Sequence, residues 1–163
     1  MRLKTLDVIL LEGDKTNIAD AVIYAWTKSL FTHCVIAKNE LGDIWDPTIG
    51  GILNRNIQDY GDRYKTVCRF NQEIPVEKVG EMIAWINQKQ LYCHGYDWLA
   101  WLGFATGIKA LEDEDAWYCS ELPYWMFWDA GYHLTPEEET FITPRFYLYS
   151  KDFQTILWQE VEI

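Results

Sequence analysis

The sequence predicts an α+β domain, and two observations predict it. Short apolar runs bounded by turn residues are typical of strands, whereas several longer segments carry apolar residues at helical spacing. The order along the chain is strand, helix, strands, helices and a closing strand, so the two kinds of element do not alternate regularly. This grouping favours an α+β domain over an alternating α/β domain.

The first half of the chain supplies most of the expected strands. Residues 7–11 (DVILL) form an apolar run, and residues 17–30 follow as a helix that begins at an Asn cap candidate. The β-rich stretch FTHCVIAK, residues 31–38, is followed by turn residues and then by IWDPTIGGIL, residues 44–53, which predicts a hairpin or meander. Residues 63–70 (RYKTVCRF) are a further strand candidate.

The second half is predicted to be mainly helical. Residues 76–90 have helical periodicity, and the apolar, Gly-punctuated stretch of residues 95–108 is also expected to be helical. A third helix covers SELPYWMFWDAG and is closed by Gly131. Residues 151–159 (KDFQTILWQ) have strand character.

Composition restricts the class of protein. A chain of 163 residues with 49% hydrophobic residues is expected to form one domain, residues 1–163. The net charge of −11, without a basic run, argues against a nucleic-acid partner. No stretch reaches the roughly 20 apolar residues of a membrane span, and the N-terminal stretch indicates a strand rather than a signal peptide. We therefore expect a cytoplasmic protein, or a component of a phage or other particle.

Four cysteines, at positions 34, 68, 93 and 119, are expected to be free thiols because no secretion signal is recognised. A zinc site from Cys93, His94 and Cys119 lacks any CxxC or HxxxH spacing. The sequence therefore predicts no metal site and no cofactor.

The stretch WYCSELP places Cys119 at the start of a helix. Proline is tolerated in a helix only in its first turn, so Pro123 requires the helix to begin close to Cys119 or Ser120. The positive end of the helix dipole and the unpaired amides there lower a thiol pKa and can stabilise an oxyanion, although Glu121 opposes the thiolate. Cys119 is therefore a candidate nucleophile, with a buried packing role as the alternative.

A cysteine nucleophile needs a base and a group that orients the base. Alternation in FTHCVIAK puts His33 and Val35 on one face of the strand, and Cys34 and Ile36 on the other. His94 and His133 lie in expected loops. Asp46 in IWDPT is the best placed acid, whereas Glu40 and Asp43 are expected in the turn but stay open as alternatives.

Five short motifs occur in a characteristic order: FTHCVIA, DIWDPTIGGI, GYDW at 95–98, YCSEL at 118–122 and TPRFYLYSKDF near the end. In this order they resemble the circularly permuted, papain-like branch of the NlpC-type cysteine peptidase superfamily. This branch comprises the YiiX/YebB-like proteins and is kin to lecithin:retinol acyltransferase. The resemblance spans roughly residues 7–153, with 86 residues from His33 to Cys119 (119 − 33).

The resemblance implies a papain-like fold, in which a small antiparallel sheet or barrel packs on helices and the nucleophile stands at a helix N-terminus. It implies Cys119 as nucleophile, His33 as general base and Asp46 as the orienting acid, where relatives often have Glu. It also implies that the motif TPRFYLYSKDF leads into a last strand.

Further candidates would stabilise an oxyanion or contact substrate. They are the amide of Cys119 or of a helix-start residue such as Ser120, and the hydroxyls of Tyr118 and Tyr96. Both tyrosines are equally compatible with packing roles.

Three functions follow as hypotheses. The leading one is a thiol hydrolase that cleaves an amide bond in a peptide or a cell-wall-type peptide through an acyl-enzyme. The second is an ester- or lipid-directed acyl hydrolase or acyltransferase. The third is a non-catalytic structural or accessory module, for instance in a phage particle. The expected partner is a peptide or an acylated small substrate.

Overall fold

A computed structural model describes residues 1–14, 16–48, 50–92, 119–134 and 142–163 of the chain. The described helices, strands and 3-10 turns are, in chain order: β1 (Val8–Glu12), α1 (Ile18–Thr27), β2 (Phe31–Ala37), β3 (Asp43–Thr48), β4 (Gly51–Asn56), η1 (Ile57–Tyr60), β5 (Lys65–Phe70), α2 (Val76–Tyr92), α4 (Glu121–Asp129), α5 (Pro144–Tyr149), β6 (Phe153–Leu157) and η3 (Trp158–Glu160). These elements confirm the α+β class, with strands and helices where the sequence predicts them over most of the described chain.

The six strands form one antiparallel sheet in the order β4-β3-β2-β1-β5-β6. The central strand β1 pairs with β2 on one side and with β5 on the other, so that Leu10 lies opposite both Cys34 and Thr66. In the described residues the sheet is open, with β4 and β6 as its outer strands, and it does not close into the barrel that was the alternative.

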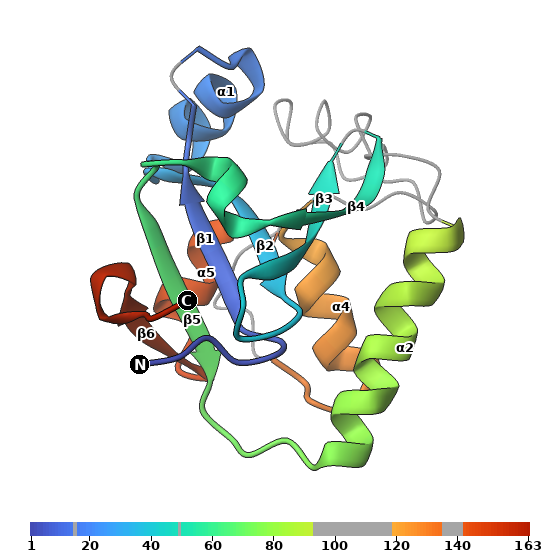
Figure 1. Cartoon of the computed structure of the whole chain (residues 1–163). Coiled ribbons are helices and arrows are strands. Elements are labelled where there is room, and N and C mark those ends of the chain that lie inside the picture. The colour runs from blue at the N-terminus through green and yellow to red at the C-terminus, as the bar shows by residue number, and fades with distance from the viewer. Residues whose placement is uncertain (15, 49, 93–118, 135–141) are drawn as a thin grey trace.

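Both faces of the sheet are covered, which explains the continuous apolar run of β1. On one face, Val8 and Leu10 pack in a core with α2 and α4, which Figure 1 shows beside each other against the sheet. On the other face, Ile9 and Leu11 pack beneath the N-terminal residues, η1 and η3. The alternation of side chains along each strand divides the interior into these two cores.

The short helix α5 was not predicted. The motif TPRFYLYSKDF does lead into the last strand, β6 (Phe153–Leu157), but Pro144–Tyr149 before that strand is helical. Pro144 occupies the first turn, where a missing N–H costs nothing, and its fixed φ favours the helix. Tyr147 from α5 is fully buried and packs edge-on against Phe153, so tertiary contacts hold this short helix.

Helix α1 has the predicted position, but several apolar side chains in and beside it are exposed to solvent. Of its apolar residues, Ile23 is buried, whereas Ile18 is 80% exposed and Tyr24 is 51% exposed. Leu30, just beyond the helix, is 58% exposed. The predicted helical stretch of residues 95–108 lies outside the described residues.

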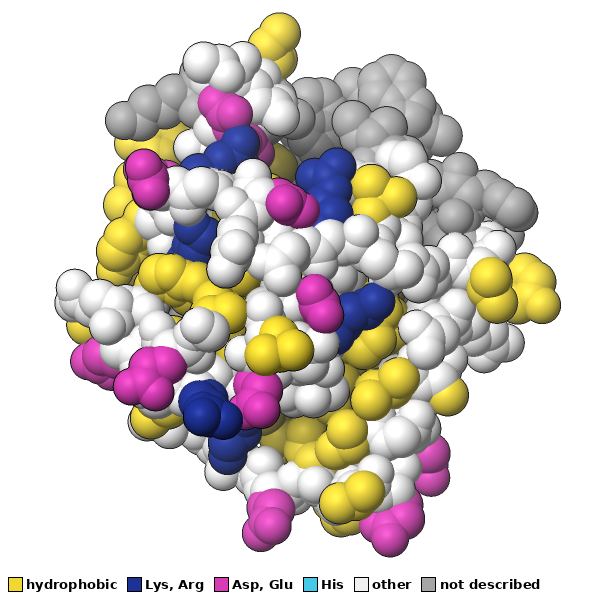
Figure 2. Space-filling view, in the orientation of Figure 1, with side chains coloured by type: hydrophobic (Ala, Val, Ile, Leu, Met, Phe, Trp, Pro, Cys, Tyr) yellow, Lys and Arg dark blue, Asp and Glu magenta, His cyan; other side chains and the backbone are white. Residues whose placement is uncertain are grey.

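The face of the molecule seen in Figure 1 carries acidic, basic and apolar side chains interspersed with one another, as Figure 2 shows. No described histidine is visible on this face. No helix in the described part of the chain is both long and apolar enough to span a bilayer.

The pair Arg69–Asp7 is expected to stabilise the sheet. Asp7 is 2% exposed, and Arg69 contacts both of its carboxylate oxygens, at 2.9 Å from Nε and 2.7 Å from the guanidinium NH2 group. Arg69→Met should lower the free energy of unfolding by about 3–5 kcal/mol, because it leaves a buried carboxylate without its charged partner. Urea denaturation measures this loss.

The matched control is Arg2→Met. Arg2 pairs with Glu40 at 3.2 Å, but the two side chains are 70% and 54% exposed, so the loss should stay within about 1 kcal/mol. Equal losses for the two variants would contradict the structural role of Arg69.

Candidate active site

The structure places His33 and Asp46 side by side on neighbouring strands. His33 lies on β2 and Asp46 on β3, and their Nε2 and Oδ1 atoms are 2.8 Å apart. His33 projects from the face of β2 that also carries Val35, as alternation predicts. Its side chain is 17% exposed, whereas that of Asp46 is fully buried.

Asp46 is held by groups on three elements. Besides His33, the hydroxyl of Tyr60 on η1 donates to Oδ2 at 2.8 Å, and Arg55 on β4 forms an ion pair with the same oxygen at 3.2 Å. A buried carboxylate is tolerated when its oxygens accept hydrogen bonds and a cation lies near. Burial, and then the charge of Asp46, raises the pKa of Tyr60, so this tyrosine keeps its proton and acts as a donor.

Cys119 comes from the opposite layer of the molecule. It lies two residues before the start of α4, with Ser120 as the N-cap and Pro123 in the first turn. This geometry confirms that the candidate nucleophile stands at a helix N-terminus. Cys119 is 2% exposed and belongs to the core beneath the helices, and its carbonyl oxygen accepts a hydrogen bond from the Cys34 thiol at 3.0 Å.

A gap between β2 and β3 lets Cys119 meet His33. The backbone hydrogen bonds that pair β2 with β3 begin next to the turn, where Lys38 bonds to Asp43. They continue to the pair Ile36 and Trp45 and end there. In the same register, the next hydrogen-bonded pair would join Cys34 to Pro47. Proline has no backbone N–H and cannot complete that pair. Beyond this point the two strands are not hydrogen-bonded to each other.

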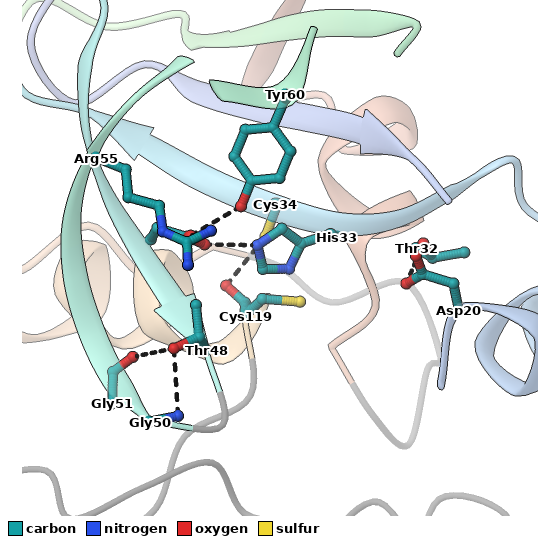
Figure 3. Close-up of polar contacts among 11 residues, drawn as sticks. Asp20, Thr32, His33, Cys34, Thr48, Gly50, Gly51, Arg55, Tyr60 and Cys119 are labelled. Atoms are coloured by element: carbon teal, nitrogen blue, oxygen red, sulfur yellow. Dashed lines mark hydrogen bonds and ion pairs between the residues drawn. The ribbon is translucent and has the colours of Figure 1, made fainter. Parts of the chain in front are cut away.

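The start of α4 fills this gap. The sulfur of Cys119 accepts hydrogen bonds from the thiol and the backbone N–H of Cys34, which faces the side where the ladder to β3 has ended. A hydrogen bond also joins the sulfur to the side chain of His33. In Figure 3 the second ring nitrogen of His33 lies on the side of the Cys119 sulfur, away from the nitrogen that contacts Asp46.

The thiol and the imidazole stabilise each other in their charged forms. The hydrogen bond from the Cys34 thiol lowers the pKa of Cys119 well below its ordinary value, against the opposing effect of burial, and the charge of His33 lowers it further. Burial alone would lower the pKa of His33, but the charge of Cys119 and the hydrogen bond to Asp46 raise it to about 10. The arrangement therefore favours a thiolate–imidazolium pair at neutral pH, and the positive end of α4 adds to this preference.

The other sequence candidates lie elsewhere or are engaged. The hydroxyl of Ser120 donates to the carbonyl of Ile142 at 2.6 Å and is buried, so it serves the fold. Glu40 pairs with Arg2, and Asp43 accepts hydrogen bonds from Asn39 and Asn56 in the turn, so neither contacts His33.

Several candidates lie outside the described residues, namely Tyr96, Tyr118, Cys93 and His94. His133 is described. It packs against Trp128 with ring centroids 4.2 Å apart, away from Cys119.

Sequence reasoning missed three residues of the site. Arg55 could have been predicted from the sequence. The hairpin that joins Thr48 to Gly51 sets a register in which Asp46 lies opposite Leu53, and Arg55 is two residues after Leu53 on the same strand. Cys34 was assigned to the face opposite His33, which is correct, but nothing local predicts that α4 approaches it. Tyr60 lies on a 3-10 turn and has no recognisable pattern.

A cavity of about 460 Å³ opens beside the site, on the face of β2 from which Cys34 also projects. Its lining includes the apolar side chains of Tyr24 and Leu30 and the buried hydroxyl of Thr32, the residue before His33. Three carboxylates also line it, from Glu12, Asp14 and Asp20. Figure 3 shows the Cys119 side chain directed to the side where Asp20 and Thr32 lie.

Comparison with known proteins shows the fold. No family model matches the chain, and no curated protein matches it. The crystal structure of YiiX from Escherichia coli O157:H7, described there as a metalloprotein, matches with a TM-score of 0.72. The match covers 96% of this chain and 97% of that chain at 15% sequence identity. The chain therefore has a YiiX-like α+β fold, while the roles of its residues rest on its own geometry.

The description of YiiX as a metalloprotein raises the question of a metal site here. Within the described ranges, no group of three or more His, Cys, Asp and Glu side chains is placed to hold a metal ion. Nε2 of His33 contacts Asp46, and both oxygens of Asp46 are engaged by protein groups. These residues do not fit a metal centre.

Asp46→Asn tests the charge arrangement. Removing the carboxylate charge should lower the pKa of His33 from about 10, because the imidazolium keeps Cys119 but loses the second of its two anionic partners. An NMR titration of the His33 ring protons measures this shift. Tyr60→Phe is the control, since it removes one donor but keeps the carboxylate, and it should change the pKa of His33 less. An unchanged pKa in Asp46→Asn would contradict the role given to Asp46.

Proposed function

We propose that this protein is a thiol hydrolase that cleaves an amide bond, in a peptide or a cell-wall-type peptide, through an acyl-enzyme on Cys119. The observation that carries the proposal is the meeting of Cys119 and His33 across the gap between β2 and β3, with Asp46 behind the imidazole. A thiolate of lowered pKa, a protonated imidazole and an orienting acid are the groups that acyl transfer requires.

The first half of the reaction uses the charged pair directly. The Cys119 thiolate attacks the carbonyl carbon, and the carbonyl oxygen becomes an oxyanion in the tetrahedral intermediate. His33 then gives its proton to the leaving amine as the C–N bond breaks, which leaves a thioester on Cys119. Asp46 accepts the hydrogen bond from Nε2 and keeps the ring oriented throughout.

The second half releases the acid. Neutral His33 removes a proton from water, which attacks the thioester carbon, and the C–S bond breaks to restore the thiolate–imidazolium pair. Backbone N–H groups at the start of α4 have no partners within the helix, and they are the candidate donors for the oxyanion.

The order of the site residues supports membership of the permuted NlpC-type, papain-like class. The histidine strand precedes the cysteine helix along the chain, and the overall fold resembles that of YiiX. In this proposal the six-stranded sheet supplies the base and the acid, while the helical layer supplies the nucleophile.

The cavity lined by Thr32, the residue before His33, is the candidate binding site for the groups that flank the scissile bond. Its volume of about 460 Å³ is within the range of small-ligand sites. Its carboxylates disfavour a fatty acid or an anionic lipid headgroup, which is why an amide substrate ranks first. The apolar walls of Tyr24 and Leu30 keep an uncharged acyl ester as the second candidate.

The pH dependence of alkylation tests thiol activation without a substrate. Because the pKa of Cys119 is lowered, its thiolate persists below the ordinary thiol pKa, and its reaction with iodoacetamide should be lost only as the pH falls through that lowered value. Cys34 and Cys68 have raised pKa values, about 12 for Cys68, and should stay unmodified at pH 7. Peptide mass spectrometry after a timed reaction measures each site.

His33→Ala should move the alkylation profile of Cys119 to higher pH, since the thiolate loses its imidazolium partner. The matched control is His133→Ala, which alters an exposed histidine outside the site. If Cys119 reacted no faster than Cys34 or Cys68 at pH 7, the non-catalytic module would become the better hypothesis.

A substrate panel tests the reaction itself. Peptide amides and uncharged acyl esters are compared, and the covalent intermediate is detected as an acyl adduct on Cys119 by mass spectrometry. We expect amide cleavage that Cys119→Ala abolishes and that His33→Ala reduces by about 10²–10⁴-fold. Cleavage of esters alone would select the acyl hydrolase, and failure of both substrate classes would reject hydrolysis.

A further inference from the structure

Two cysteine side chains meet at the site, one from each layer. Cys34 projects from β2, and its single S–H proton is shared between the carbonyl oxygen of Cys119, at 3.0 Å, and the sulfur of Cys119. Cys34 is fully buried and Cys119 is 2% exposed. The acyl-transfer steps give Cys34 no covalent role, so this second thiol calls for a separate explanation.

The two thiols are in opposite chemical states. His33 and the hydrogen bond from Cys34 lower the pKa of Cys119, whereas burial raises the pKa of Cys34. A thiolate reacts with a hydroperoxide much faster than a neutral thiol does, so oxidation starts at Cys119. The sulfenic acid formed there would then have an unoxidised thiol in contact with it.

We propose that hydroperoxides convert Cys34 and Cys119 into a reversible intramolecular disulfide. The disulfide rests on the contact between the two side chains. Its consequence, a reversible loss of Cys119 as the nucleophile for hydrolysis, rests on the proposed function as well. The ligand class of this modification site is a small hydroperoxide, with hydrogen peroxide as the simplest member.

The chemistry balances in two steps. In the first, the Cys119 thiolate attacks one oxygen of hydrogen peroxide, the O–O bond breaks, and the hydroxide that leaves takes a proton and becomes water. In the second, the Cys34 sulfur attacks the sulfur of the sulfenic acid, the S–O bond breaks, and the leaving hydroxide departs as water with the Cys34 proton. Overall, two thiols lose two electrons and two protons, and one peroxide becomes two waters.

The surroundings favour this pair over the other described thiol. Cys34 lies where the β2–β3 ladder has ended, so on that side its backbone is not tied to β3. Cys68 lies on β5, separated from Cys34 by the central strand β1, which places the two strands roughly 10 Å apart. A disulfide requires Cα atoms within about 7 Å, so Cys68 is not a suitable partner for Cys34.

The experiment oxidises the full-length chain with hydrogen peroxide, the simplest member of the proposed ligand class. Non-reducing digestion and mass spectrometry should yield linked peptides that contain Cys34 and Cys119, with the loss of two hydrogens. Dithiothreitol should remove the link and restore iodoacetamide labelling of Cys119 to its initial extent.

Two variants sharpen the result. In Cys34→Ala the link should be absent, and Cys119 should proceed to the sulfinic and sulfonic acids, which dithiothreitol does not reverse. Cys68→Ala is the matched control, since it also removes a buried core thiol but should oxidise and recover as the wild type does. Circular dichroism before oxidation shows whether each variant is folded.

Two outcomes would overturn the inference. One is oxidation of Cys119 to sulfinic acid in the wild type while Cys34 stays a free thiol. The other is a link from Cys119 to Cys93 or Cys68 instead. The mass of the linked peptides reports the disulfide directly, so this result stands or falls separately from hydrolysis of any substrate.

Discussion

The early end of the ladder between β2 and β3 is the feature on which the candidate site depends. His33 and Asp46 project from one face of the sheet, whereas Cys119 belongs to the helical layer on the other face. A continuous sheet would separate them. Because Pro47 cannot pair with Cys34, the strands are unpaired where α4 begins, and the thiol reaches the imidazole through the sheet. The same opening exposes the Cys34 amide to the sulfur of Cys119.

Charge balance makes this buried site tolerable. The thiolate of Cys119, the imidazolium of His33, the carboxylate of Asp46 and the guanidinium of Arg55 form a row of alternating sign. Each buried charge has an opposite charge beside it, which offsets the cost of removing it from water. Neutral donors support both anions of the row, the Cys34 thiol at Cys119 and the Tyr60 hydroxyl at Asp46.

Activation of the thiol and its sensitivity to oxidation have the same origin. Whatever lowers the pKa of Cys119 makes it a better nucleophile toward a carbonyl and also toward a peroxide. Cys34 takes part in both proposed reactions, since its hydrogen bond would stabilise the thiolate and its sulfur would trap a sulfenic acid on Cys119. In the proposed function, the cavity lined by Tyr24, Asp20 and Thr32 is the candidate space for the carbonyl substrate.

The sequence by itself determined the local features of this protein. Alternation placed His33 opposite Cys34 on β2, Pro123 placed Cys119 at a helix start, and the turn residues after Ala37 predicted the hairpin that carries Asp46. These features depend on backbone preferences within a few residues, which is why periodicity and turn chemistry reveal them. The short helix at Pro144 was missed, because tertiary packing rather than local preference holds it.

Only the tertiary structure decided that Cys119 meets His33, that Tyr60 and Arg55 hold Asp46, and that Cys34 contacts the candidate nucleophile. These contacts join residues up to 86 positions apart (119 − 33). They arise from the packing of the helical layer against an interrupted sheet, and no pattern within a single segment of the chain specifies that packing.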